Sequence, residues 1–115
     1  MANIIDKRLL ITGGAGYIGT ALTKRRISEG AQVTIFDSLK TGQRMLVNQH
    51  AHIFEGNVRN LEDLEYICSR SNLGTVIHLA ALKSVGEGEK APANFMNVNV
   101  SVTLNVLEVM RTKYS

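Results

Sequence analysis

The sequence predicts an α/β fold in which a doubly wound parallel sheet carries helices on both faces. Short apolar runs alternate with longer runs of helical periodicity, in the order strand, helix, strand, strand, helix, strand. That order requires crossover connections, which produce parallel sheets. A glycine-rich turn follows the first apolar run, and an acidic residue ends the second. We expect residues 1–115 to form a single domain, because a chain of this length can bury roughly two thirds of its unfolded surface.

The first strand breaks into closely spaced glycines and reopens as a helix. We expect the strand at 8–12 and the helix over about 17–29, where Gly30 closes it. The N–H groups of the first helical turn, those of Tyr17 and Ile18 among them, have no partner within the helix and carry the positive end of its dipole. A strand, turn and helix of this kind predict a site for the pyrophosphate of a dinucleotide.

Each glycine of this turn has a separate physical reason to be there. Gly13 and Gly14 permit a tight turn, because glycine has no Cβ to restrict its backbone. Gly16 lets the backbone approach the phosphates, and Gly19 lets the helix pack close to the strand.

The second strand, expected at 32–36, ends at Asp37, which lies 23 residues beyond Gly14. An acidic residue at about this spacing hydrogen-bonds the ribose hydroxyls of adenosine in Rossmann-type domains. Its charge would also repel the additional phosphate of NADP, although Lys40 and Arg44 nearby keep that choice open. The sequence therefore predicts a dinucleotide site with NAD as the cofactor.

The remaining elements complete the alternating pattern. We expect a polar loop over 38–48, a third strand at 52–55, and a helix from Asn60, its cap, to about residue 71. The run 75–79 is continuously apolar, as strands buried on both faces are. A loop over 81–91 then lies at the carboxyl end of this fourth strand, where open α/β sheets bind ligands.

The last segment carries two conflicting patterns. Pro92 can open a helix that runs towards Lys113, but residues 98–106 alternate apolar and polar side chains as a strand would. A helix remains the better interpretation, because its apolar residues then form two stripes, which implies two buried faces. One stripe holds Phe95, Val98, Val102, Val106 and Val109, and the other holds Met96, Val100, Leu104 and Leu107.

Composition excludes several other functions. The net charge of +3 is modest, and the chain has only three Tyr, three Phe and no Trp, which disfavours nucleic-acid binding. Cys68 cannot form an internal disulfide, and His50 and His52 have no third ligand at metal spacing. We therefore expect no metal site. The sequence shows neither a membrane-spanning run nor a leader at its start, so we expect a cytoplasmic protein.

Beyond these patterns, the residues resemble the amino-terminal part of UDP-glucose 4-epimerases, within the extended short-chain dehydrogenase/reductase superfamily. The resemblance covers nearly the whole chain and is most specific at the run Ala-Leu-Lys-Ser-Val-Gly-Glu. It is carried by residues 12–19, Asp37, residues 56–60, residues 76–87 and Asn99.

The resemblance implies a set of cofactor contacts. Beside Gly13, Gly16 and Gly19, Tyr17 and Ile18 would meet the pyrophosphate, and Asn99 would lie at the phosphate region. The adenosine contacts would be Asp37, Ser38, Leu39, Lys40, Thr41 and Gly42, with Asn57 and Val58 at the adenine. The ribose on the nicotinamide side would meet Leu79, Ala80, Ala81, Leu82 and Lys83.

Two substitutions depart from the family pattern. The family usually has aspartate, which accepts a hydrogen bond from the adenine amino group, where this chain has Asn57. The amide oxygen of Asn57 can still accept, so we expect weaker selectivity for adenine and no loss of binding. The family also favours glycine where Val102 stands, which would change how the last helix packs.

Length is the larger departure. Family members continue into a fifth strand, a Tyr-x-x-x-Lys pair for acid-base chemistry and a domain for the UDP-sugar, and no Tyr-x-x-x-Lys occurs here. Tyr17 is followed four places on by Ala21, Tyr66 by Arg70, and Tyr114 by the chain end. Without a tyrosine beside a lysine no general base is poised to take the sugar hydroxyl proton. We expect no catalytic residue, and no turnover by this chain alone.

The sequence thus predicts the NAD-binding half of an epimerase-like protein, with the sheet truncated after the fourth strand and its following helix, in the strand order 3-2-1-4. A UDP-sugar would bind only to a longer form. A non-catalytic module for nucleotide binding or partner docking is the alternative, and a structural remnant with an empty site is a third. The open edge of the fourth strand and the second stripe of the last helix favour a homo-oligomer.

Overall fold

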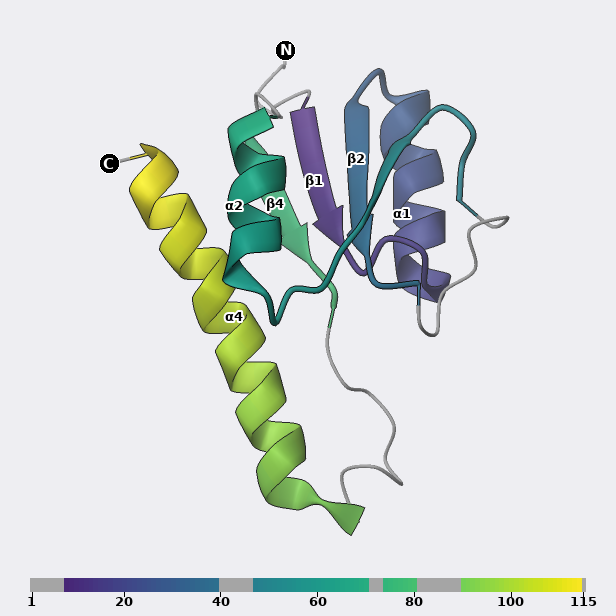
Figure 1. Ribbon diagram of the computed structural model, residues 1–115. Coiled ribbons are helices and arrows are strands. Elements are labelled where there is room, and N and C mark those ends of the chain that lie inside the picture. Colours follow the sequence, from purple (N-terminus) through teal and green to yellow (C-terminus); the bar gives the residue numbers. More distant parts are fainter. Residues whose placement is uncertain (1–7, 40–46, 71–73, 81–89, 115) are drawn as a thin grey trace.

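A computed structural model describes residues 8–39, 47–70, 74–80 and 90–114 (Figure 1). The elements follow in the order β1 (Arg8–Thr12), α1 (Tyr17–Ser28), β2 (Gln32–Asp37), β3 (His52–Glu55), α2 (Leu61–Arg70), β4 (Thr75–His78) and α4 (Pro92–Tyr114). All seven expected elements are confirmed, with ends that differ from the expected ones by one residue or so.

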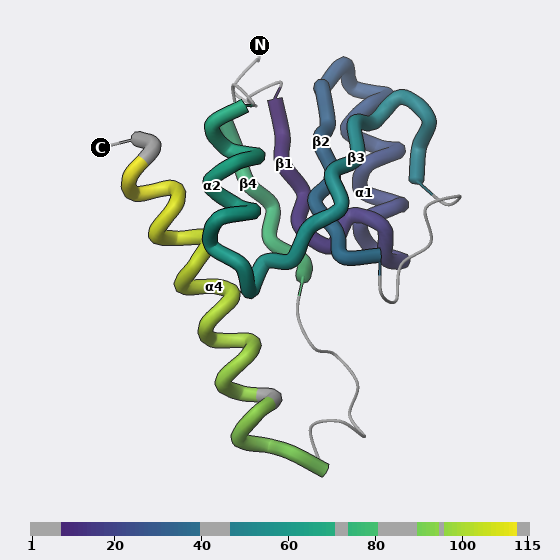
Figure 2. The backbone as a smooth tube through the Cα atoms, viewed as in Figure 1, coloured from purple at the N-terminus to yellow at the C-terminus, as the bar shows by residue number. Residues whose placement is uncertain are grey.

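The four strands form one parallel sheet in the order β3-β2-β1-β4, as predicted. β1 lies at its centre, with Leu10 opposite both Thr34 of β2 and Val76 of β4. Because all strands are parallel, their carboxyl ends lie at one edge of the sheet, which faces the lower part of Figure 2.

Successive side chains of the central strands point to opposite faces and build two apolar layers. Leu9 and Ile11 of β1 pack with the α1 side of the molecule, where the partly buried Leu22 and Ile27 join them. Leu10 of β1 and Phe36 of β2 pack on the other side with residues of α2 and α4. Figure 1 shows the same division, with α1 on one face and α2 and α4 on the other.

α4 is helical despite its alternating sequence, because helical spacing buries the valines of one expected stripe. The side chain of Phe95, the other expected member, lies outside what the structure describes. Val98, Val102, Val106 and Val109 are all buried, and the last two lie in one cluster with Leu64 of α2. The second stripe stays on the surface of this chain. Its members Met96, Val100, Leu104 and Leu107 are 53–64% exposed.

β4 is less buried than its apolar sequence predicts. The strand ends at His78, one residue earlier than expected, and Val76 and Ile77 are half-buried. The reason is its position, since β4 pairs only with β1 among the described strands. Leu79 still extends the pairing, because its N–H donates to the Thr12 carbonyl at 2.9 Å.

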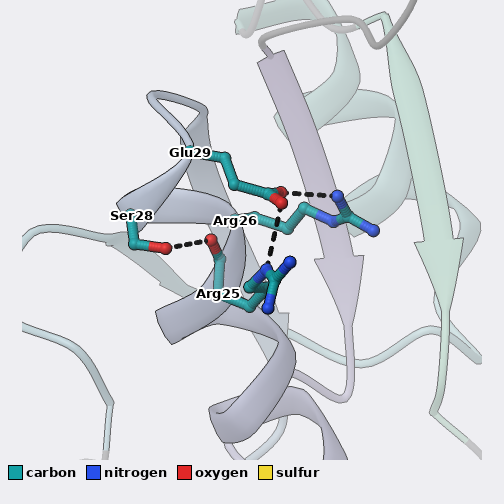
Figure 3. A network of polar contacts seen from close by, with 4 residues as sticks. All are labelled: Arg25, Arg26, Ser28 and Glu29. Atoms are coloured by element: carbon teal, nitrogen blue, oxygen red, sulfur yellow. Dashed lines mark hydrogen bonds and ion pairs between the residues drawn. The ribbon is translucent and has the colours of Figure 1, made fainter.

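The carboxyl end of α1 is fastened by a small polar network (Figure 3). Arg25 Nε and Arg26 Nη1 lie 3.0 and 2.6 Å from the two carboxylate oxygens of Glu29. The hydrogen bond from Arg25, with that from Arg26, lowers the pKa of Glu29. Gly30 follows with φ +92°, the left-handed conformation that turns the chain towards β2.

α1 lies against the preceding loop at Gly19, where there is no room for a side chain. A Cβ on Gly19 would lie 2.5 Å from Gly14 Cα and 2.7 Å from the Gly13 carbonyl oxygen, and neither backbone atom can move aside cheaply. Gly19→Ala should lower the free energy of unfolding by about 1–3 kcal/mol, measured by urea denaturation.

Gly16→Ala is the matched control for this experiment. Gly16 has extended backbone (φ −82°, ψ −176°), and its Cβ would meet only the Gly13 carbonyl oxygen, at 3.5 Å. Alanine fits there, so the Gly16 variant should keep its stability. Equal losses in the two variants would contradict the steric argument.

Candidate dinucleotide-binding site

The loop between β1 and α1 is held so tightly that side chains do not fit. Gly13 has φ +72°, and a Cβ there would lie 2.8 Å from the backbone nitrogen of Ala80. Gly14 lies in the expected turn, which the Gly16 N–H closes on the Gly13 carbonyl, although Gly14 itself has no positive φ. A Cβ on Gly14 would lie 2.7 Å from Ile35 Cγ2, so its small size serves packing against β2.

Hydrogen bonds within the loop leave one group of donors open. Gly13 N–H donates to the Phe36 carbonyl at 2.8 Å, and Gly16 N–H donates to the Gly13 carbonyl at 3.2 Å. Gly16 is the N-cap of α1 and supplies no side chain to the first turn. Within the described parts of the chain, the N–H groups at 17–19 have no acceptor, so they can hydrogen-bond an anion.

Asp37 lies at the carboxyl end of β2 and supports the same loop. Its Oδ2 accepts from the Ala15 N–H at 2.9 Å, and its Oδ1 accepts from the Leu39 N–H at 2.7 Å. Leu39 has φ +60°, which a bulky side chain rarely adopts. The carboxylate therefore fixes the glycine loop and the turn after β2 together, and it remains half-buried at the edge of the sheet.

A second polar cluster joins the ends of β1 and β4, and our sequence reasoning missed it. The Thr12 hydroxyl lies 2.6 Å from His78 Nδ1 and accepts from the N–H groups of Leu79 (3.1 Å) and Ala80 (3.3 Å). The Leu79 N–H is shared with the Thr12 carbonyl. The Thr12 hydroxyl can donate to Nδ1 when the imidazole is neutral with its proton on Nε2. The only available signal was a polar residue at the end of each of two apolar strands.

Burial lowers the pKa of His78 below the ordinary value of 6.5. The neutral imidazole also suits the hydrogen bond from Thr12, because a protonated Nδ1 could not accept it. The pair therefore holds the start of the β4 loop in one arrangement while His78 is uncharged.

The loop after β3 forms a third part of this edge. Asn57 N–H donates to Asp63 Oδ2 at 3.1 Å, and Asn57 Oδ1 accepts from the Arg59 N–H at 2.9 Å. Asn60 caps α2 as predicted, with Oδ1 2.9 Å from the Glu62 nitrogen. From α4, Asn105 Nδ2 donates to the Val58 carbonyl at 2.9 Å, another contact that the sequence did not reveal.

The structure brings most of the expected contacts to this one edge of the sheet. The residues so placed are Gly13, Gly16, Tyr17, Ile18, Gly19, Asp37, Ser38, Leu39, Asn57, Val58, Leu79 and Ala80. Asn99 is half-buried in the amino-terminal half of α4. Lys40, Thr41, Gly42, Ala81, Leu82 and Lys83 lie outside the described residues, as does Arg44.

The described residues contain neither a cluster suited to a metal ion nor a helix that could span a membrane. No three His, Cys, Asp or Glu side chains gather there in a way that could hold a metal ion. Among the described helices, none combines the length and apolar character needed to cross a membrane.

A parallel sheet whose first loop leaves backbone donors open, beside an acidic residue that ends the second strand, defines a dinucleotide-binding domain of the Rossmann type. Residues 9–114 match the model of the NAD dependent epimerase/dehydratase family. The chain belongs to this family, whose members depend on NAD.

Individual relatives agree with this assignment. The Bifunctional protein GAL10 of Candida maltosa is 36% identical in an alignment of 115 positions that covers 93% of this chain and 75% of that protein. A UDP-glucose 4-epimerase of Cyamopsis tetragonoloba is 34% identical over 89% of this chain. A structure of Thermus thermophilus UDP-glucose 4-epimerase in complex with NAD superposes on 91% of this chain with a TM-score of 0.86 and 33% identity. The chain spans 32% and 34% of the latter two.

The lowered pKa of His78 predicts how stability depends on pH. The unfolded chain takes up a proton at this residue near pH 6.5, whereas the folded chain does so only at lower pH. Stability should therefore fall as the pH drops below about 6.5. His78→Asn offers Thr12 an oxygen near the place of Nδ1 but cannot titrate, so its free energy of unfolding should fall less between about pH 7 and pH 5.

Two ion-paired carboxylates do not titrate in this window. The arginine partners of Glu29 and Glu108 lower the pKa of both carboxyls below 4.5, so they stay ionised in the window. His52→Asn, at an exposed position on β3, controls for the loss of a histidine as such. Urea denaturation curves at several pH values give the result, and identical pH slopes for His78→Asn and the unmodified chain would refute the assignment.

Proposed function

We propose that this chain binds NAD at the carboxyl edge of its sheet. The observation that carries the proposal is the β1–α1 loop, where a Cβ on Gly13 or Gly19 has no room and the N–H groups of the first α1 turn remain open. The pyrophosphate would lie against these donors, with the positive end of the α1 dipole behind them. Backbone donors that are open at a helix N-terminus fit the pyrophosphate of the family's cofactor.

The remaining parts of the cofactor find chemically suitable neighbours. The Asp37 carboxylate, which already accepts from two backbone N–H groups, would also accept from the adenosine ribose, and its charge disfavours NADP. The adenine would lie beside Asn57 and Val58. The ribose on the nicotinamide side would lie near Leu79 and Ala80, which Thr12 holds in place.

The reaction that this NAD would serve is the interconversion of UDP-glucose and UDP-galactose. The support is that the relatives include UDP-glucose 4-epimerases, of which this chain spans about a third. The 115 residues contain no Tyr-x-x-x-Lys pair. We therefore infer that they contribute cofactor binding, and that acid-base chemistry and the UDP-sugar site need further residues.

A second candidate function rests on the exposed stripe of α4. A module that binds a nucleotide and docks a partner would also have an anion cradle and an apolar surface. Release of a bound partner when NAD is added would favour this function over the epimerase one. For the epimerase function we propose a cytoplasmic location, where NAD and nucleotide sugars would be available.

Binding of NAD is the direct test of the proposal. Isothermal calorimetry should give a Kd above about 1 μM for NAD, because only part of the nicotinamide side lies in this chain, and weaker binding for NADP. Gly16→Ala should lower the affinity for NAD about tenfold or more, since its Cβ would occupy the place where the phosphates approach the backbone.

The Cβ of the Gly16→Ala variant makes only ordinary contact within the fold, so a loss of NAD affinity in this variant would not come from a loss of stability. A folded chain that binds neither NAD nor ADP-ribose would refute the proposal. If the Gly16→Ala variant and the unmodified chain bind NAD with equal affinity, the phosphates do not lie against this loop.

We also propose a twofold dimer through the exposed stripe of α4, for which the support is four large apolar side chains opposite the buried valines. Placing charges in the stripe with Val100→Glu and Leu104→Glu should dissociate the dimer in sedimentation experiments, because buried carboxylates without partners are costly.

A control pair adds the same charges elsewhere. Ser69 of α2 and Ser101 of α4 are exposed and lie outside the stripe, so Ser69→Glu with Ser101→Glu should leave the dimer intact. Sedimentation as a monomer at all concentrations would contradict the dimer. A dimer that survives both charge pairs would place the contact at the β4 edge.

A further inference from the structure

A buried hydroxyl group collects three hydrogen bonds where β1 and β4 end. Thr12 is fully buried, so water does not reach this group. Its oxygen lies 2.6 Å from His78 Nδ1, 3.1 Å from the Leu79 nitrogen and 3.3 Å from the Ala80 nitrogen. A hydroxyl has one hydrogen and two lone pairs, so these three neighbours use its whole hydrogen-bonding capacity while the imidazole is neutral.

Protonation of His78 disrupts this arrangement. A protonated Nδ1 is a donor, so the Thr12 oxygen would face three donors with two lone pairs, and its own hydrogen would lose its acceptor. Leu79 N–H has a second acceptor, because its nitrogen lies 2.9 Å from the Thr12 carbonyl oxygen. Ala80 N–H has no second acceptor within the described residues. The bond from Ala80 is therefore the one that yields.

The charged groups around His78 do not stabilise either of its protonation states. His78 follows Val76 by two positions on β4, so both side chains lie on the face of the sheet that α2 and α4 cover. Burial is the cause that lowers the pKa of His78. Within the described residues, the charged side chains of β1, α2 and α4 are exposed, namely Arg8, Glu62, Glu65, Arg70, Lys90, Glu108 and Arg111. Asp63 and Asp37 accept from backbone N–H groups of other loops.

Ala80 lies directly against the glycine loop. A Cβ on Gly13 would lie 2.8 Å from Ala80 N and 3.0 Å from Ala80 Cα, so the two backbones are in contact. The Gly13 carbonyl accepts from Gly16 N–H at 3.2 Å, and Gly16 is the N-cap of α1. A displacement of Ala80 therefore reaches the open N–H groups at 17–19 through backbone contacts.

We propose that protonation of His78 weakens NAD binding, because it releases Ala80 from Thr12 and loosens the backbone that supports Gly13. The histidine acts through Thr12 and Ala80 and needs no contact with the cofactor. NAD binds the neutral form better, so its affinity is full above the pKa of His78 and falls as the pH drops through it. This inference rests on the proposed NAD site and adds a pH dependence to it.

Calorimetry of NAD binding at about pH 7.5 and about pH 5 tests this switch, with circular dichroism to show that the chain is folded at both. The Kd of the unmodified chain should be about threefold to tenfold higher at the lower pH. A tenfold change corresponds to a difference of about one between the pKa values of His78 in the bound and free chain. His78→Asn keeps an acceptor for Thr12 but cannot titrate, so its Kd should change little.

His52→Asn is the matched control, because it removes an exposed histidine from β3. This variant should keep the full change in Kd. Any effect of pH on NAD itself is common to all variants, so differences between them come from the protein.

Two substitutions of Thr12 separate its hydroxyl from the charge of the histidine. Thr12→Val has a similar volume but no hydroxyl, so protonation has no bond to break and the change in Kd with pH should disappear. Thr12→Ser keeps the hydroxyl and should restore the change. The comparison uses the ratio of two Kd values within each variant, which a general loss of affinity does not alter.

Amide hydrogen exchange at Ala80 reports on the switch without NAD. Its protection factor, corrected for the intrinsic effect of pH on exchange, should fall by about threefold or more between the two pH values in the unmodified chain. The same protection factor should stay constant in His78→Asn.

The outcomes separate the switch from the function on which it rests. If the folded chain binds no NAD at either pH, the proposed function is wrong and the coupling falls with it. If NAD binds and the Kd of His78→Asn rises as much as that of the unmodified chain, NAD binding stands and the switch is refuted. A full change in Thr12→Val, or constant protection at Ala80 in the unmodified chain, would refute it as well.

Discussion

The close approach of backbone to backbone at the carboxyl end of β1 is the constraint on which this site depends. At Gly13 the chain passes so near the start of the β4 loop that a Cβ would lie 2.8 Å from Ala80 N. At Gly19 the helix passes over the same loop with even less room. Within the described residues, the N–H groups at 17–19, which follow this loop, have no hydrogen-bond acceptor. Asp37 then secures the loop through Ala15 N–H, so the acidic residue that ends β2 contributes to the shape of the cradle as well as to its chemistry.

The arrangement of elements could be predicted from the sequence because apolar periodicity distinguishes strands from helices and glycines mark turns and close backbone contacts. Crossover connections predict a parallel sheet, and the resemblance to the epimerases implies its strand order. Gly13 and Gly19 mark places where a side chain would collide. Other features could not be read in this way, because they depend on which polar atoms come within hydrogen-bond distance across the sheet edge. The Thr12–His78 pair joins residues 66 positions apart, and the bond from Asn105 to Val58 spans 47. Gly14 shows the same limit. It lies in the expected turn, but the atoms that exclude a Cβ there belong to the Ile35 side chain, which the sequence did not indicate.

α4 illustrates how tertiary packing decides between two local patterns. Residues 98–106 alternate as a strand does, and valine favours strands. The helix prevails because its spacing places Val98, Val102, Val106 and Val109 on one line, where all four are buried. A strand would bury the alternate valines but would need a partner strand, whereas the helix satisfies its own backbone groups and packs against α2. The cost of this solution is the second apolar stripe, which the helix turns towards the surface.

The two faces of α4 have separate consequences for the site. Asn105 projects from the side of the helix that holds the buried valines and fixes the loop proposed to hold the base, whereas Val100 and Leu104 lie on the exposed stripe. A contact on the stripe therefore does not need to displace the bond from Asn105. Conversely, the loop at Asn57 is held by groups within this chain, namely Asp63, Asn60 and Asn105. Binding of the base thus depends on hydrogen bonds within one chain, whereas the proposed dimer depends on the exposed stripe of α4. A substitution can therefore abolish one of the two and leave the other intact.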